Sequence, residues 1–96
     1  MHKNETRDKL RKQKPVLGPF VGLQSPHVAE LMGHAGFDFV VVESEHNAIE
    51  SAEIEHILMA VGNTDSTPIV RIPSSEKVYI QKALDIGAMG IVVPAV

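Results

Sequence analysis

Short apolar runs alternate along the chain with longer segments in which apolar residues recur every three or four positions. The first pattern is typical of strands buried on both faces, and the second is typical of amphipathic helices. Strands are therefore predicted at residues 16–23, 37–42, 67–72 and 91–93, with a helix between each pair. Because consecutive parallel strands need a crossover connection, the order β-α-β-α-β-α-β predicts a parallel sheet.

The predicted helices have polar residues at their starts, glycines at their ends and one apolar face each. The N-caps are expected to be Ser25, Asn47 with Glu50 as its capping-box partner, and either Ser74 or Ser75. The helices are expected to end at Gly36, Gly62 and Gly87. The buried faces are expected to comprise Val28, Leu31, Met32 and Ala35, then Ile54, Ile57, Leu58 and Val61, then Ile80, Ala83 and Leu84. Met32, Met59 and Met89 are expected to fill the core.

Four strands and three helices leave both edges of the sheet open and the last strand without a covering helix. A (β/α)8 barrel needs about 250 residues. We therefore predict an α/β fold that is the N-terminal half of a TIM barrel, truncated, over residues 15–96, preceded by a charged and solvated leading helix or arm over residues 1–14. An open flavodoxin-like sheet is the alternative, but residues 24–27 make a poor version of its phosphate-binding loop.

Composition narrows the class of protein without identifying it. The chain has 44% hydrophobic and 22% charged residues and a formal net charge of −3, so nucleic acid and anionic membranes are not the expected partners. It contains no cysteine, which excludes disulfides and thiolate zinc sites and fits a cytoplasmic protein. No apolar run approaches the roughly 20 residues of a membrane span.

Reactive groups in parallel β/α folds gather where the strands end. The second predicted strand runs directly into Glu43, Ser44, Glu45 and His46. His46 can act as a general base near neutral pH, and either glutamate could orient it or reach a metal through water. The alternative is a polar loop above a buried strand.

Arg71 ends the third predicted strand, which is otherwise apolar. A guanidinium at that place can stabilise an oxyanion or hold a carboxylate, or it can simply cap the end of the sheet. Asp85, late in the third predicted helix, resembles a surface acid when taken by itself.

Three motifs together resemble those of a known family. Residues 22–46 read G-L-x-S-P-x-x-A-E-L-x-x-x-A-G-F-D-F-V-V-V-E-x-E-H, residues 68–73 read P-I-V-R-I-P, and residues 79–96 read Y-I-Q-K-A-L-D-I-G-A-x-G-I-V-V-P-x-V. In this order they resemble the HpcH/HpaI family of class II pyruvate aldolases, in the phosphoenolpyruvate/pyruvate barrel superfamily. The resemblance implies a metal-dependent retro-aldol cleavage of a 2-oxo-4-hydroxy acid to pyruvate and an aldehyde.

The resemblance also implies roles for particular residues. His46 matches the catalytic base, Arg71 the arginine that stabilises the transition state and contacts substrate, and Asp85 an acid that raises the basicity of the histidine. Asp85 would have to act through a neighbouring subunit or an unusual packing, and a homo-oligomer is expected. Phe20 stands where the family often has a tryptophan and would line the substrate site. Glu43 and Ser44 stand where the family commonly has Asp-Gly.

The implied cofactor is Mg²⁺, Mn²⁺ or Co²⁺, with its ligands in the second half of the barrel and none in this chain. The 96-residue chain by itself is therefore expected to be inactive. Two other functions stay open: a related enolate enzyme, citrate-synthase-like or decarboxylating oxaloacetate, and a non-catalytic half-barrel.

Overall fold

The order of elements agrees with the sequence prediction, and the leading segment forms a helix at the start of the chain. The computed structural model describes residues 3–22, 25–44 and 52–94. Its elements are α1 (Glu5–Arg11), β1 (Phe20–Val21), α2 (Pro26–His34), β2 (Phe39–Glu43), α3 (Ala52–Gly62), β3 (Thr67–Arg71), α4 (Lys77–Asp85) and β4 (Gly90–Val92).

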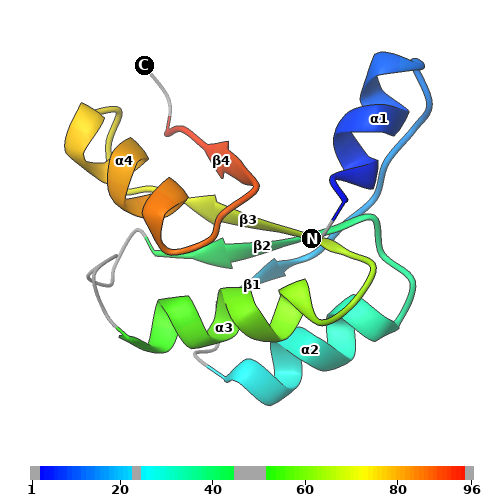
Figure 1. Cartoon of the computed structure of the whole chain (residues 1–96), viewed down its shortest axis with the longest axis horizontal. Coiled ribbons are helices and arrows are strands. Elements are labelled where there is room, and N and C mark those ends of the chain that lie inside the picture. The colour runs from blue at the N-terminus through cyan, green and yellow to red at the C-terminus, as the bar shows by residue number, and fades with distance from the viewer. Residues whose placement is uncertain (1–2, 23–24, 45–51, 95–96) are drawn as a thin grey trace.

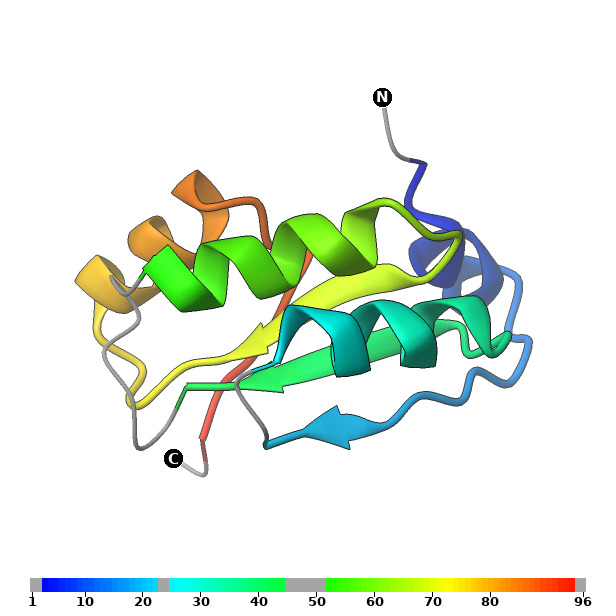
Figure 2. The same ribbon diagram turned by 90° about the horizontal axis from the view of Figure 1, so that it is seen from below.

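The four strands form one parallel sheet in the order β1-β2-β3-β4, so the predicted parallel arrangement is confirmed. Figure 1 shows the strand arrows pointing the same way. α2 and α3 lie side by side on one face of the sheet, as Figure 2 shows from below. Each of the first three strands is therefore followed by a helix that returns the chain to the side where the next strand begins.

The core lies between the sheet and its helices, and α3 provides much of it. The predicted stripe of Ile54, Ile57, Leu58 and Val61 is buried, as expected. These side chains pack with Val40 and Val42 of β2 and with Val70 and Ile72 beside them, all in one cluster. Truncating one such side chain typically costs about 2–5 kcal/mol, so this interface fixes how the sheet and α3 sit together.

The buried face of α2 differs from the prediction. Leu31 is 68% exposed and Ala35 is also exposed, whereas Ala29 and Gly33 are buried. A Cβ atom on Gly33 would overlap with the side chain of Thr64, two residues after the end of α3. The two helices approach closely through their smallest residues, so the larger apolar side chain of Leu31 is turned outward. The predicted stripe was therefore wrong for Leu31 and Ala35, whereas Met32 packs against the core as expected.

Three smaller expectations for α3 and α4 were also wrong. Met59 and Leu84 are 60% and 55% exposed, because each lies on the helix face turned away from the cluster. The N-cap of α4 is Glu76 rather than either serine, and its side chain makes no capping bond. The Ser74 hydroxyl instead accepts from the Glu76 amide. The predicted C′ glycines at Gly36 and Gly87 do adopt positive φ, 101° and 112°.

β1 is shorter than predicted, because only Phe20 and Val21 are strand residues. Prolines without an N–H group precede it, so a regular ladder cannot extend backward. The backbone of this segment still pairs with β2: the carbonyl groups of Leu17 and Pro19 accept from Asp38 and Val41. A Cβ atom on Gly18 would overlap with the carbonyl oxygen of Phe39, so glycine permits this close approach.

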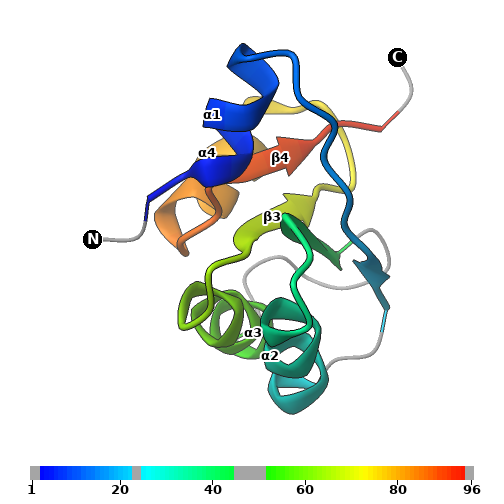
Figure 3. The same cartoon turned by 90° about the vertical axis from the view of Figure 1, so that its right-hand side faces the viewer.

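α1 is docked against the sheet rather than solvated as the sequence suggested. Thr6 is buried, and its hydroxyl donates to the carbonyl of Asp38 at 2.8 Å. The side-chain amide of Asn4 donates to the carbonyl of Met89 at 3.1 Å. Figure 3 shows α1 beside the start of β4, on the opposite side of the sheet from α2 and α3. The helix therefore ties together the edge at which the strands begin.

Candidate active site

The strand register brings two charged side chains together at the end of the sheet where all the strands terminate, which we call the second edge; the end where the strands begin is the first edge. Glu43 is the last residue of β2, Arg71 is the last residue of β3, and their Cα atoms are partners in the ladder. Side chains alternate between the faces of a strand. Since Val42 and Val70 pack against the helices, Glu43 and Arg71 lie on the other face of the sheet. In a closed barrel that face lines the interior.

Glu43 and Arg71 form an ion pair across the two strands. Arg71 Nη1 lies 3.4 Å from Glu43 Oε2, and the side chains are only 34% and 20% exposed. A guanidinium carries five N–H donors in a fixed fork, a geometry that suits carboxylates and oxyanions. The pair therefore places a partly buried positive charge at the end of the sheet, with its direction set by a neighbouring strand.

Ser44 fixes the backbone next to this pair. It is fully buried, and its amide donates to the carbonyl of Arg71 at 3.2 Å. Its hydroxyl donates to the same carbonyl. On the other side, the amide of Ile72 donates to Val92 at 3.1 Å. From the sequence alone, Ser44 stood out only as a departure from glycine. The signal that could have identified its role is a serine close to the end of an apolar strand, where its hydroxyl would be buried and would need a hydrogen-bond partner.

Phe20 lies on the same face as the ion pair. Its Cα partner is Val41, two residues before Glu43 on the same face of β2. The ring is 57% exposed, whereas the next residue, Val21, is buried among the helices. Phe20 is thus placed one side-chain layer below the charged pair, as an apolar surface facing the interior.

The other predicted site residues do not join this group in the described part of the chain. Asp85 is exposed at the end of α4, which leads back to the start of β4, whereas Arg71 stands at the end of β3. Glu45 and His46 lie outside the described residues, as do the predicted caps Asn47 and Glu50. Within residues 3–22, 25–44 and 52–94, no three His, Cys, Asp or Glu side chains gather closely enough to hold a metal.

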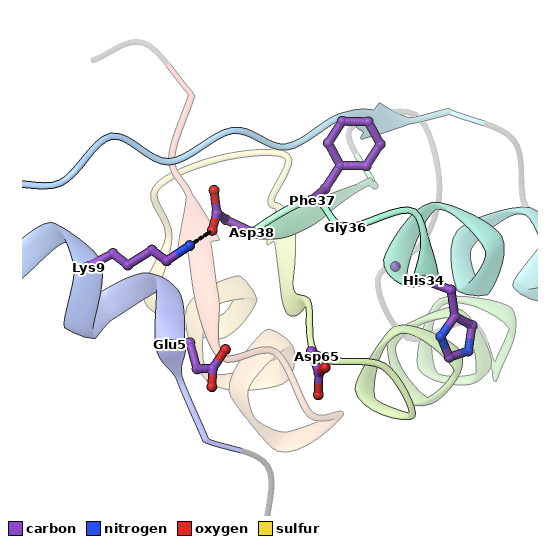
Figure 4. A pocket seen from close by; sticks show the side chains of 8 residues that line it. Glu5, Lys9, His34, Gly36, Phe37, Asp38 and Asp65 are labelled. Atoms are coloured by element: carbon purple, nitrogen blue, oxygen red, sulfur yellow. Dashed lines mark hydrogen bonds and ion pairs between the residues drawn. The ribbon is translucent and has the colours of Figure 1, made fainter.

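A polar hollow of about 270 Å³ lies at the opposite edge, where β2 and β3 begin. Figure 4 shows Lys9 reaching from α1 to Asp38, with Glu5 and Asp65 on the same rim. The hydrogen bond from Lys9, followed by that from the Leu17 amide, lowers the pKa of Asp38. The same contact raises the pKa of Lys9. Lys9 and Asp38 hold α1 against the sheet here, so this hollow lies at a structural joint.

The stabilising contacts where the strands begin and the charged side chains where they end are both typical of one class of protein. A parallel β/α sheet with its reactive side chains at the carboxyl ends of the strands is the arrangement of TIM-barrel-type enzymes, and these four strands are the N-terminal half of such a barrel. The chain belongs to the HpcH/HpaI aldolase/citrate lyase family, whose model matches residues 17–96. The family resemblance and the barrel prediction are thereby confirmed. In the described part of the chain, the helices are all too short or too polar to cross a membrane.

Individual relatives support the assignment. The chain is 39% identical over 87 residues to 2-dehydro-3,6-dideoxy-6-sulfogluconate aldolase of Pseudomonas putida, an alignment that covers 91% of this chain and 34% of that enzyme. A solved HpcH/HpaI aldolase/citrate lyase family protein from Burkholderia cenocepacia superposes with a TM-score of 0.86 at 31% identity, covering 98% and 38% of the two chains. The citrate synthase SbnG superposes with a TM-score of 0.87 at 34% identity and the same coverage.

The chain spans about a third of the length of the curated relatives it matches. The family is one of aldolases and lyases, and relatives named as aldolases act on small acidic molecules. What the whole protein does with such molecules is a separate inference.

Proposed function

We propose that the whole protein that contains this chain is a carbon–carbon lyase that cleaves 2-oxo-4-hydroxy acids to pyruvate and an aldehyde. The observation that carries the proposal is the partly buried Arg71, oriented by Glu43 on the inner face at the carboxyl end of the sheet. A fixed cation there suits the negative charge that develops on the oxygen of a pyruvate enolate. The aldolase names among the relatives support the same reaction type.

The reaction is a retro-aldol cleavage. His46, through a water molecule, removes the proton of the C4 hydroxyl group, and a carbonyl forms at C4. The C3–C4 bond breaks, and its electron pair passes into the enolate, whose oxygen Arg71 stabilises. The proton held by His46 returns to C3, which gives pyruvate. Phe20 would form an apolar wall of the substrate site, since its ring is exposed on the inner face.

The proposed metal, Mg²⁺, Mn²⁺ or Co²⁺, does not fit the described residues. No suitable group of three ligating side chains occurs among them, and the Glu43 carboxylate is engaged with Arg71. The metal therefore remains an expectation from the family resemblance, with its ligands outside this chain, and the steps above use the chain's own residues.

Two further roles are proposals from the same resemblance. Glu45 would support His46 from the adjoining loop. Asp85 would raise the basicity of His46 from a neighbouring subunit, because it ends α4 and is exposed, as a residue that reaches a second copy must be. This role requires a homo-oligomer.

A second candidate is favoured by the likeness to SbnG, a citrate synthase. The same stabilised enolate could attack a carbonyl group to form a carbon–carbon bond instead of arising from cleavage. Supplying the whole protein with Mg²⁺ and a panel of 2-oxo-4-hydroxy acids, and separately with oxaloacetate and an acyl donor, distinguishes the two by the product that accumulates.

The decisive experiment measures pyruvate released from a 2-oxo-4-hydroxy acid by the whole protein and by its His46→Ala variant. We expect the variant to lose about 10²- to 10⁴-fold in turnover, which is the usual contribution of a general base, while it stays folded. Glu55→Gln, an exposed change on α3, is the matched control and should retain full turnover. Near-normal turnover in His46→Ala would end the general-base assignment. The 96-residue chain assayed by itself should release no pyruvate.

A further inference from the structure

We infer that Glu43 and Ser44 together position Arg71, and that Glu43 serves the reaction through this arginine rather than through His46. We call the pair the Arg71 clamp. The inference rests on the proposed function, because it names the residues that orient the cation acting on the enolate. It gives Glu43 a different role from the one that the sequence alone suggested.

The clamp holds both ends of the arginine. Glu43 contacts the guanidinium at Nη1, and Ser44 donates two hydrogen bonds, from its amide and its hydroxyl, to the backbone carbonyl. Because Glu43 and Arg71 are Cα partners in adjacent strands, their side chains leave the same face at the same level. Adjacent strands lie only about 4.8 Å apart, so this pairing is built into the sheet.

The chemistry of arginine explains why a clamp is useful. Its long side chain has many rotamers, and a donor helps only when it lies within about 3 Å of the developing oxyanion. A carboxylate that contacts one nitrogen restricts the orientation of the planar fork, so fewer rotamers of the arginine remain. Ser44 is fully buried, so the backbone end cannot shift without breaking hydrogen bonds that water does not replace.

The test is a double-mutant cycle in the whole protein, with Glu43→Gln, Arg71→Ala and the double variant. If Glu43 acts through Arg71, the single variant Glu43→Gln has a kcat lower than that of the wild type on the order of 10- to 100-fold, because a misplaced catalytic group costs about that much. When Glu43→Gln is added to Arg71→Ala, kcat changes by less than about twofold. The acidic limb of the kcat/KM profile, which reports the general base, should stay within about 0.3 pH unit in Glu43→Gln. A purely structural role would leave no such dependence on Arg71.

Two outcomes would overturn the clamp. One is a full further loss when Glu43→Gln is added to Arg71→Ala, and the other is a displaced acidic limb, since both would show that Glu43 acts on His46. Glu55→Gln is again the control for loss of a carboxylate elsewhere. If Glu43→Gln does not fold by circular dichroism, Glu43→Asp carries the cycle, because it keeps the charge and withdraws it from Arg71 by one methylene.

A binding measurement separates failure of the clamp from failure of the proposed function. Oxalate is a planar dianion that mimics pyruvate enolate, and its affinity can be measured by calorimetry with Mg²⁺ present. We expect the single variant Glu43→Gln to bind oxalate about tenfold more weakly than the wild type. The double variant should bind oxalate almost as tightly as Arg71→Ala alone. Additive losses would contradict the clamp even if the protein is a lyase. A wild-type protein that neither releases pyruvate nor binds oxalate would refute both.

Discussion

An ion pair stands at each edge of the sheet, and the two pairs differ in what surrounds them. Where the strands begin, Lys9 meets Asp38, and the same carboxylate also accepts from the backbone amide of Leu17. Where the strands end, Arg71 meets Glu43, and the two side chains lie on the inner face. The first pair joins a helix to the sheet, and the second joins two side chains that face the interior.

The polar contacts around each pair explain the difference. At the first edge, Thr6 and Asn4 add hydrogen bonds from α1 to backbone carbonyls, so the side chains there hold elements in place. At the second edge, Ser44 holds the backbone while the guanidinium extends beyond it. In barrels of this type, the first edge serves stability and the second serves chemistry. The edges should therefore respond differently to substitution.

The largest expected contrast is between Arg71→Ala and Lys9→Ala in the whole protein. Arg71→Ala should lower turnover about 10²- to 10³-fold, as loss of an oxyanion donor does. Lys9→Ala should lower the midpoint of thermal unfolding and leave kcat within about twofold of the wild type, because Lys9 faces the other edge. Kinetics and thermal melts on the same preparations give both numbers. A large loss of turnover in Lys9→Ala would remove the distinction between the edges.

Gly18→Ala tests packing at the first edge without touching a charge. The added Cβ would overlap with the carbonyl oxygen of Phe39, which is backbone and cannot swing aside. We expect a loss of about 3 kcal/mol in the free energy of unfolding, measured by urea denaturation, since overpacking commonly costs 1–3 kcal/mol. Gly62→Ala is the matched control. Nothing lies within 4 Å of its added Cβ at the end of α3, so stability should stay equal or rise.

Structural features that depend on local sequence patterns were predicted well. The alternation of runs and stripes gave the parallel sheet and the buried face of α3, and the strand ends correctly placed Arg71 and Glu43 at one edge. The roles of His46, Glu45 and Asp85 stay predictions, because the first two lie outside the described residues and no contact between Asp85 and a described residue bears on catalysis.

Features that depend on distant contacts could not be predicted. α1 docks through hydrogen bonds to residues 32 and 85 positions away, and no local pattern encodes them. The pairing of Glu43 with Arg71 follows from strand register, which a strand prediction with uncertain ends does not fix. The buried face of α2 depends on close packing at Gly33, so small residues outweighed hydrophobicity.

Thr6→Val should weaken the first edge by a smaller amount. Valine has nearly the shape of threonine but cannot donate to the carbonyl of Asp38, which Thr6 reaches at 2.8 Å. Losing such a hydrogen bond in a buried place costs about 1 kcal/mol. Thr6→Ser keeps the hydroxyl and isolates the effect of the methyl group. Denaturant unfolding measures the difference, and equal loss in both variants would show that packing, rather than the hydrogen bond, holds α1.

The smallest effect is the pH dependence of the Lys9–Asp38 pair, and its sign follows from the pKa shifts. The lowered pKa of Asp38 means that its contribution is complete above the ordinary value of 3.8 and is lost as pH falls through the lower folded value. The raised pKa of Lys9 means that its contribution is complete below 10.5 and is lost as pH rises through the higher folded value.

The difference in thermal midpoint between wild type and Asp38→Asn should therefore be flat from about pH 5 to 9 and shrink only in stronger acid or base. Asp65→Asn, an exposed change on the same hollow, is the control and should show a smaller difference. Because the Lys9–Asp38 pair keeps both of its charges across this range, a midpoint difference that varied near pH 7 would show that the pair is not its source.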